Sequence, residues 1–379
     1  MQRTMLAGLD ARSFLRRHWQ KRLLLARRAL PEYGNLITRD GLFALAARED
    51  VQSRLVTRAA GRWHVAHGPF TRRALSRLPR RGWTLLVQGL NEVLPRAQQL
   101  LLEFDFIPYA RLDDVMVSYA PPGGGVGPHF DSYDVFLLQI AGTRRWRVSR
   151  QRDLALVAGA PLKILARFRT ATEWRLGPGD MLYLPPQIAH DGVAVDECLT
   201  ASIGFRAPGA RELAARFLEF LQDGIELEGA YRDPELEPAR HPAQIGEAMI
   251  DKVAAMLARI EWRENDVIAF LGQYLTEPKP HVVFERPARP LSFADFARRA
   301  QRDGIALALK TLMLYRGRTV FINGECLSVG AGAARPLARL ADRRCLAPGA
   351  ALDADAQRFL YPWYRAGYIV LANKGRRSR

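Results

Sequence analysis

Cysteine is scarce in this sequence, and the few cysteines present exclude two common architectures. Only three occur among 379 residues, at Cys198, Cys326 and Cys345. An odd number at wide spacing provides neither a disulfide framework nor the CxxC pairs of a zinc site. Unpaired cysteines of this kind are typical of a reducing compartment. We therefore expect a cytoplasmic protein without structural disulfides.

Long apolar runs are also missing. No stretch approaches the roughly 20 apolar residues that a membrane-spanning helix requires. Near the N-terminus, Asp10, Arg12, Arg16 and Arg17 interrupt the apolar core that a secretory signal peptide would need. The sequence therefore predicts neither a membrane span nor a signal peptide.

Acidic residues are outnumbered by basic ones. The 56 lysines and arginines exceed the 39 aspartates and glutamates, which gives a formal charge of +17. Such an excess often accompanies an anionic partner such as nucleic acid. The alternative is a generally arginine-rich composition, since the basic residues are spread along the whole chain. Composition alone leaves both interpretations open.

The rest of the composition is that of an ordinary globular protein, with 48% hydrophobic and 25% charged residues. The length predicts two or three domains. Residues 1–95 alternate short helical patterns with basic turns, including a helix over 39–56. Residues 96–208 have the pattern of short strands separated by glycine- and proline-rich turns, which is typical of a β-barrel or β-sandwich. The expected strands are 115–119, 129–140, 144–148, 181–184 and 199–205.

Helical spacing of apolar residues returns in residues 209–277. The residues at this spacing are Leu213, Phe217, Phe220, Leu221, Ile245, Met249, Val253, Met256, Leu257 and Ile260. Their wide apolar stripes predict helices that form a homodimer interface. The alternative is that these helices pack against the barrel within one chain.

A proline-rich linker at 278–290 precedes a small α+β segment that extends to residue 379. In this segment we expect a helix over 293–300, a hairpin that turns at Asn323-Gly324, a helix near 355–364 and a final strand over 368–372. The basic tail at 374–379 is expected to be mobile.

Three residues of the β-rich segment are candidate metal ligands. His129 and Asp131 stand at i and i+2, so on a strand both side chains point to the same face. His190 follows a tight turn and a short apolar strand, where a closing barrel would bring it to the same place. Two imidazoles and one carboxylate leave open positions on iron(II) for a cosubstrate and oxygen. The alternative for an isolated H-x-D is a surface turn. Among the remaining histidines, His64 and His67 could suggest a second metal pair, but surface roles are favoured for them.

Arg144 is singled out by the phase of its strand. In the run RRWRV at 144–148, Arg144 shares a face with Trp146 and Val148, whereas Arg145 takes the other face. The face that carries tryptophan and valine is the buried one. A buried guanidinium needs an anionic partner, and a ligand carboxylate matches its planar fork. The alternative is an internal salt bridge. Ser202, on strand 199–205, is a further candidate for the same carboxylate, with simple packing as its alternative.

Three motifs together resemble the JmjC-type branch of the cupin superfamily, and most closely the bacterial ribosomal oxygenases. They are the segment 119–150, which contains GGGVGPHFD at 123–131, the run GPGDMLYLPPQIAH at 177–190, and SIGFRAP at 202–208. The similarity extends more weakly over the helical region and the C-terminal segment. It therefore covers most of the chain.

This resemblance implies iron(II) ligation by His129, Asp131 and His190, and 2-oxoglutarate bound by Arg144 with Ser202. The fold class it implies is α+β: a jelly-roll catalytic domain at 96–208 with an N-terminal extension at 1–95, a helical dimerisation domain at 209–277 and a winged-helix-like domain at 278–379. The implied activity is hydroxylation of a large-subunit ribosomal protein, with ribosomal RNA as a further potential contact. Arginine is the acceptor in bacterial members, whereas eukaryotic relatives hydroxylate histidine.

Acidic residues near the motifs could attract an arginine-bearing loop of the substrate. These residues are Asp105, Asp113, Asp114, Asp134, Asp191, Asp196 and Glu197. Their alternative is a set of ordinary solvated turns. Two rival functions also stay open: a cupin that uses the three ligands for another metal-dependent reaction, and a ligand-sensing regulator that binds nucleic acid through the C-terminal domain.

Overall fold

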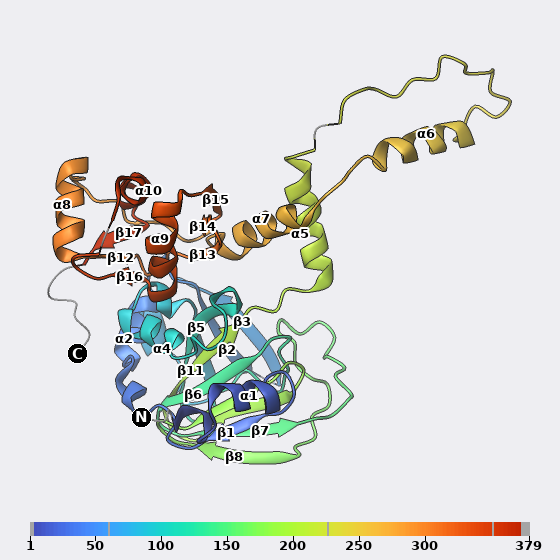
Figure 1. Cartoon of the computed structure of the whole chain (residues 1–379). Coiled ribbons are helices and arrows are strands. Elements are labelled where there is room, and N and C mark those ends of the chain that lie inside the picture. Colours follow the sequence, from blue (N-terminus) through green and yellow to red (C-terminus); the bar gives the residue numbers. More distant parts are fainter. Residues whose placement is uncertain (1–3, 60, 226, 351, 373–379) are drawn as a thin grey trace.

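A barrel is built from two antiparallel sheets whose strands come from distant parts of the chain (Figure 1). The computed structural model describes residues 4–59, 61–225, 227–350 and 352–372. The larger sheet has the order β1-β9-β6-β11-β5-β4-β2-β3, and the smaller one has the order β10-β7-β8. The bounds are β1 Leu24–Ala26, β2 Ser53–Ala59, β3 Arg62–His67, β4 Trp83–Val87, β5 Leu112–Ala120, β6 Val135–Ala141, β7 Arg144–Ser149, β8 Thr172–Leu176, β9 Met181–Leu184, β10 Ala189–Ala194 and β11 Cys198–Phe205.

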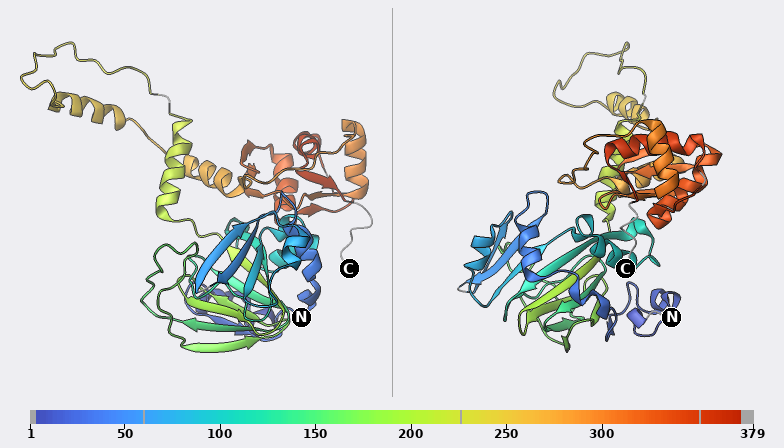
Figure 2. Two further views of the ribbon diagram at one scale, coloured as in Figure 1. Left: turned by 180° about the vertical axis from the view of Figure 1, so that it is seen from behind. Right: turned by 90° about the vertical axis from the view of Figure 1, so that its left-hand side faces the viewer.

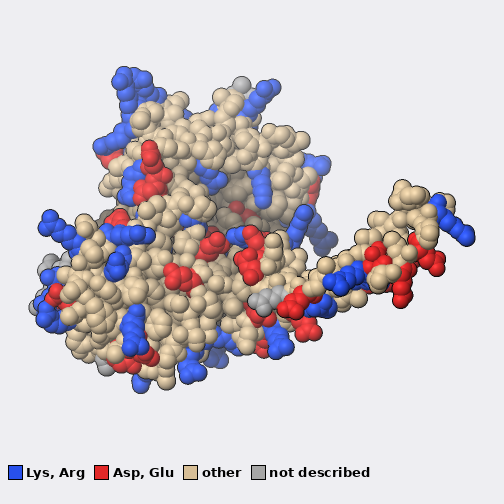
Figure 3. Space-filling view, turned by 90° about the horizontal axis from the view of Figure 1, so that it is seen from above, with Lys and Arg blue, Asp and Glu red and all other residues tan. Residues whose placement is uncertain are grey.

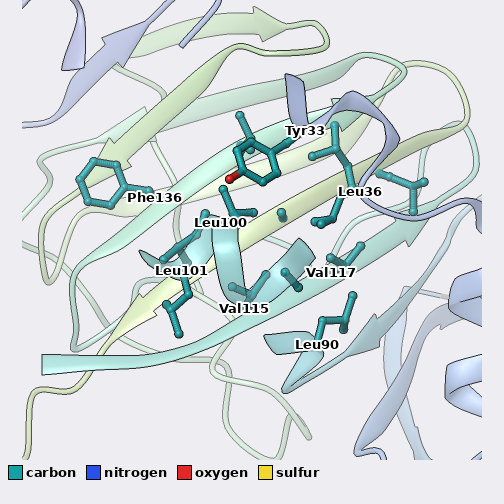
Figure 4. Close-up of a cluster of buried hydrophobic side chains, with 14 of the residues drawn as sticks. Tyr33, Leu36, Leu90, Leu100, Leu101, Val115, Val117 and Phe136 are labelled. Carbon is teal, nitrogen blue, oxygen red and sulfur yellow. The ribbon is translucent and has the colours of Figure 1, made fainter. Parts of the chain in front are cut away.

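The main hydrophobic core lies between one face of the larger sheet and the N-terminal helices α1 (Ala11–Arg17), α2 (Arg39–Ala46) and α4 (Pro95–Leu102). Figure 4 shows part of this core, where Leu100 and Leu101 of α4 face Val115 and Val117 of β5. Because side chains alternate along a strand, Ser118 of β5 points to the opposite face, toward the smaller sheet. The inner face of the barrel therefore carries polar side chains that contact one another, such as Ser118 and Arg144.

The predicted strands are confirmed at β5, β7, β9 and β11. The strand expected over 129–140 is wrong at its start, because β6 begins at Val135 and His129 joins the sheet through a single isolated bridge. The helix expected over 39–56 is also wrong. Helix α2 ends at Ala46, and the chain then forms β2, which pairs with β3 and β4. The three strands β2, β3 and β4 therefore lie in a segment for which helical patterns were expected. These segments become strands because they pair with one another across the sheet, and such pairing leaves no periodic pattern within each segment.

Helices α5 (Ala210–Gln222), α6 (Glu247–Leu257) and α7 (Glu264–Thr276) follow the barrel. Figures 1 and 2 show that α5 and α6, with the segment between them, project away from the barrel as an arm. The arm carries both acidic and basic side chains (Figure 3). No described residue of α5 or α6 is buried. The alternative of packing against the barrel is therefore wrong for α6.

The C-terminal domain packs its helices against two small sheets, β16-β12-β17 and β13-β14-β15. Its elements are α8 Phe293–Asp303, β12 Ile305–Leu307, β13 Met313–Arg316, β14 Thr319–Ile322, β15 Glu325–Ser328, α9 Ala331–Arg343, β16 Cys345–Leu346, α10 Ala354–Ala366 and β17 Ile369–Leu371. The hairpin at Asn323-Gly324 is confirmed, with both residues at positive φ. The predicted helices and the final strand are also present as α8, α10 and β17. The basic tail at 374–379 lies outside the described residues.

All three cysteines are free thiols, as expected. Among the helices of the described residues, none combines the length and the apolar character needed to cross a membrane. Lys and Arg side chains are dispersed among acidic ones on the face seen in Figure 3.

Candidate metal centre

The glycine-rich segment before His129 runs beside strand β10. Ala194 of β10 donates its N–H to the carbonyl of Gly124 at 2.9 Å. A Cβ atom added at Gly125 would lie only 2.5 Å from the carbonyl oxygen of Gly192, so this approach of two backbones requires glycine. The segment therefore delivers His129 to the side of β10.

His129 and His190 meet at this point. Each backbone N–H donates to the other residue's carbonyl, at 2.9 and 2.8 Å. The two imidazole rings lie 4.2 Å apart between centroids. Each Nδ1 is 2.8 Å from a backbone carbonyl two residues earlier, that of Gly127 or Ile188. When Nδ1 carries the proton in these hydrogen bonds, both Nε2 atoms keep a lone pair for a metal.

Asp131 completes the cluster. Its Oδ2 lies 3.6 Å from Nε2 of His190, and one ligand atom from each of His129, Asp131 and His190 lies within 4.8 Å of the others. Burial, reinforced by the neighbouring His129, lowers the pKa of His190 to about 4. His190 is therefore neutral near pH 7, as metal ligation requires. Two imidazoles and one carboxylate fit iron(II) with open coordination positions.

Arg144 lies on the same inner surface as these ligands, and two of its three guanidinium nitrogens have no hydrogen-bond partner among the described residues. The residue is 5% exposed. Its Nη1 donates to the Ser118 hydroxyl at 3.2 Å, whereas Nε and Nη2 are buried without a partner among the described residues. The guanidinium stacks on Trp146 at 5.7 Å, and the Trp146 ring lies 5.9 Å from that of His190. Trp146 Nε1 is also a buried donor without a described partner. Buried N–H donors without a partner, close to three potential metal ligands, fit the binding of an anionic ligand.

Comparisons with known proteins agree with this geometry. Residues 99–213 match the family model described as JmjC domain, and residues 256–369 match that of the ROXA-like winged helix. The chain is 35% identical over 315 residues to the ribosomal protein uL16 3-hydroxylase of Escherichia coli (strain K12), covering 82% of this chain and 84% of that protein. A probable ribosomal oxygenase of Haemophilus influenzae is 41% identical over 228 residues, or 59% of this chain and 54% of that protein.

The chain belongs to the ribosomal oxygenases of the JmjC family. Its fold agrees with that of E. coli ycfD, with a TM-score of 0.83 and 31% identity over 96% of this chain and 98% of that one. The structure of YcfD in complex with cobalt and 2-oxoglutarate has a TM-score of 0.80 and the same 31% identity, over 96% and 98% of the two chains. The jelly-roll barrel and C-terminal winged helix expected from the sequence are therefore confirmed.

In this ribosomal oxygenase, the protein partner of Arg144 is Ser118, a residue that the sequence analysis missed. The sequence did contain an indication of this role, because Ser118 is the polar residue of an otherwise apolar stretch of β5. The inward phase of Arg144 is confirmed by the alternating burial of β7. Ser202 lies on β11 opposite Met116, two positions beyond the pair that Thr200 makes with Ser118. Within the described chain, its hydroxyl makes no hydrogen bond.

Most of the seven acidic residues near the motifs are engaged elsewhere. Asp134 accepts from the Tyr183 hydroxyl, Asp191 pairs with Arg147, Asp196 accepts from the Thr143 N–H, Glu197 lies 3.5 Å from Arg39, and Asp105 is exposed on the turn after α4. The remaining two, Asp113 and Asp114, are at the start of β5. Asp113 pairs with Lys279 and lies 3.8 Å from Arg206, and Asp114 accepts from the Gly89 N–H at 3.1 Å. Asp114 shares the inner face of β5 with Ser118, so it is the candidate for attracting a cationic substrate to the barrel.

Asp114 is buried, and its charge and that of the candidate ligand Asp131 both act on Tyr133. Burial raises its pKa to about 6, although Lys279 favours the charged form. Lys279 itself contacts Asp113 at 3.2 Å. Partial burial and the negative charges of Asp131, Asp114 and Asp113 raise the pKa of the Tyr133 phenol. Tyr133 is 40% exposed, so part of its side chain reaches solvent.

The other histidines of the oxygenase lie outside this site. His64 and His67, considered above as a second metal pair, are exposed on the edge strand β3. His281 lies 3.7 Å from Glu92. Within the described residues, His129, Asp131 and His190 are the one group of three or more potential ligands close enough to hold a metal.

Proposed function

We propose that this ribosomal oxygenase hydroxylates an arginine side chain of a large-subunit ribosomal protein, the counterpart of uL16 in its own ribosome. The observation that carries the proposal is the buried, incompletely satisfied guanidinium of Arg144 beside a cluster of two histidines and one aspartate. This combination fits iron(II) together with 2-oxoglutarate. When bound, the two supply the oxidising chemistry that inserts one oxygen atom of O2 into an unactivated C–H bond, while 2-oxoglutarate becomes succinate and carbon dioxide.

The protein's part is to hold and orient the reactants. His129, Asp131 and His190 would hold the metal through one side chain from each. Arg144 would donate to the far carboxylate of 2-oxoglutarate from Nε and Nη2, which have no partner among the described residues and share one edge of the guanidinium for a bidentate contact. The Ser118 hydroxyl fixes the remaining edge of the guanidinium. Because Arg144 is buried, this charge-assisted contact is stronger than it would be in water.

The carboxylate of Asp114 supports arginine as the acceptor side chain. Asp114 and Ser118 lie on the same face of β5, four residues and therefore about 13 Å apart along the strand. Ser118 marks the Arg144 end of the inner surface, so Asp114 marks the opposite end. A Cβ atom added at Gly204 would be 3.6 Å from the Asp114 carboxylate, which shows that this carboxylate lies over β11. Asp114 Oδ2 accepts from the Gly89 N–H, so a guanidinium bound there would donate mainly to Oδ1 and would gain a charged partner, which a neutral imidazole would not.

A homodimer is the assembly that the arm favours. Large apolar side chains on and beside α6 are exposed: Ile245 70%, Met249 45%, Ile250 46%, Val253 37% and Leu257 58%. Contiguous exposed apolar surface of this kind marks a protein interface. We propose that residues 209–277 provide dimerisation and that the barrel at 96–208, with the N-terminal strands, provides catalysis. The C-terminal segment at 278–379 would provide the winged-helix module.

The test is turnover with a defined acceptor. The purified protein is incubated with iron(II), 2-oxoglutarate and a peptide from the cognate uL16, and a matched peptide carries lysine in place of the candidate arginine. We expect succinate and a gain of one oxygen on the first peptide alone, with fragmentation placing the oxygen on arginine. Oxygen found only on histidine of the peptide would contradict the proposal.

A further inference from the structure

A second concave surface of the molecule is rich in arginine. A groove of about 900 Å³ is lined by side chains of α2, of α3 (Arg72–Ser76) and of the turn that follows α3, together with Pro121 and Pro122. Five arginines line it: Arg39, Arg72, Arg73, Arg80 and Arg81. Glu197, which also lines it, follows the C-terminal end of β10, whereas His190 is near the start of that strand. The groove is therefore at the end of the barrel opposite to the candidate metal ligands.

The positive charge of the groove is largely unbalanced. Its two carboxylates are already shared: Asp40 lies 3.4 Å from Arg39 and 3.7 Å from Arg72, and Glu197 lies 3.5 Å from Arg39. The other three guanidinium groups, those of Arg73, Arg80 and Arg81, have no ion pair or hydrogen bond within the described part of the chain. All three are exposed. Five arginines against two carboxylates leave an excess of three positive charges facing one concavity.

The side-chain types indicate which anion fits. Every basic residue that lines the groove is arginine, whose planar fork binds phosphate oxygens in a bidentate manner. The aromatic residues of the floor, Phe43, Trp83 and Tyr119, are each less than a tenth exposed and cannot stack with bases. Contacts to phosphate without base stacking give binding that depends on charge and little on sequence. A concave surface also suits a polynucleotide better than a flat membrane.

We propose that this groove is an RNA-binding site that holds the phosphate backbone through Arg73, Arg80 and Arg81. RNA binding at the groove does not depend on the hydroxylation proposed above, because the groove shares no residue with the metal centre. It gives the enzyme a second point of attachment to an RNA-containing particle. Part of the net charge of +17 then has a local function.

The experiment is fluorescence anisotropy with a labelled single-stranded RNA, titrated at several salt concentrations. The test variant combines Arg73→Glu, Arg80→Glu and Arg81→Glu, and the control combines Arg335→Glu, Arg339→Glu and Arg358→Glu. The control residues are exposed on α9 and α10 of the winged helix and make the same change in charge. We expect the groove variant to bind at least about tenfold more weakly, with the slope of log affinity against log salt reduced by about 2, since each single-strand phosphate contact contributes about 0.7. The control should bind like the wild type.

Three results would overturn the proposal. Equal weakening by both variants would indicate a net-charge effect, and loss only in the control would place RNA on the winged helix. Binding of phosphatidylserine vesicles by the wild type without binding of RNA would indicate a membrane surface. Circular dichroism and metal content should be unchanged in the groove variant, so a failure of the proposed hydroxylation would be recognised separately.

Discussion

His129 and His190 are paired backbone to backbone, and this pairing sets their imidazoles 4.2 Å apart. Neither hydrogen bond uses a side chain, so this backbone bridge does not depend on which side chains are at positions 129 and 190. The metal centre is therefore built on a bridge between two distant segments, with Asp131 added two residues after His129. Substitution of a ligand side chain should therefore remove one metal contact and leave the backbone bridge in place.

His190→Ala should remove the bound metal and abolish succinate formation without unfolding the barrel. The backbone bridge survives the change, whereas one of three ligands is lost, and three-ligand sites depend on every member. His129→Ala and Asp131→Ala should behave in the same way. Metal content by mass spectrometry and far-UV circular dichroism give the two readouts. His64→Ala, on the exposed strand β3, is the control and should retain full metal content. Near-normal iron content in His190→Ala would refute the ligand assignment.

Arg144→Ala should raise KM for 2-oxoglutarate by about tenfold or more, because a charge-assisted contact contributes about 1.5–3 kcal/mol. Arg145→Ala is the matched control, since its side chain takes the other face of β7. Steady-state kinetics with varied 2-oxoglutarate measure both. Similar effects of the two substitutions would contradict a specific role for the buried guanidinium.

Ser118→Ala should also weaken binding of 2-oxoglutarate, by about 0.5–1.5 kcal/mol, because one hydrogen bond that orients Arg144 is lost. Ser202→Ala tests the residue expected from the sequence, whose hydroxyl makes no hydrogen bond within the described residues. If Ser202→Ala raises KM for 2-oxoglutarate more than Ser118→Ala does, the ligand lies closer to β11 than proposed.

The value of kcat/KM for an arginine peptide should rise with pH and be half-maximal near pH 6. The pKa of Asp114 is raised to about 6, so the carboxyl is neutral below this value and attracts the guanidinium only above it. Asp114→Asn should flatten the profile at its low value, whereas Glu173→Gln, exposed on β8, should leave it unchanged. A pH profile in Asp114→Asn identical to that of the wild type would exclude this carboxyl as the titrating group.

The protein should be a dimer at micromolar concentration, and Ile250→Asp should make it monomeric. Ile250 is 46% exposed on α6, and a charge placed in an apolar interface opposes association. Leu236→Asp is the control, because Leu236 is 76% exposed but lies outside the helices. Light scattering after size-exclusion chromatography measures the mass. A monomeric wild type would exclude the proposed interface.

The sequence predicted those parts of the site that depend on local phase and spacing. The inward position of Arg144 followed from alternation along one strand. The location of His190 followed from a turn and a short apolar strand before it. Ser118 was missed because its importance comes from β7, a strand that it does not neighbour in sequence. Strands β2 and β4 were missed for the same reason, since pairing across the sheet, and no local pattern, makes them strands.

The position of β11 has a consequence for biosynthesis. This strand lies between β5 and β6 and pairs with both, yet it is the last strand of the barrel to be made. On a nascent chain, the facing edges of β5 and β6 stay open until Phe205 has left the ribosome. Open edges are templates for aggregation, and pairing of such distant segments is slow. The completed metal pocket therefore forms late, after this central strand has been inserted.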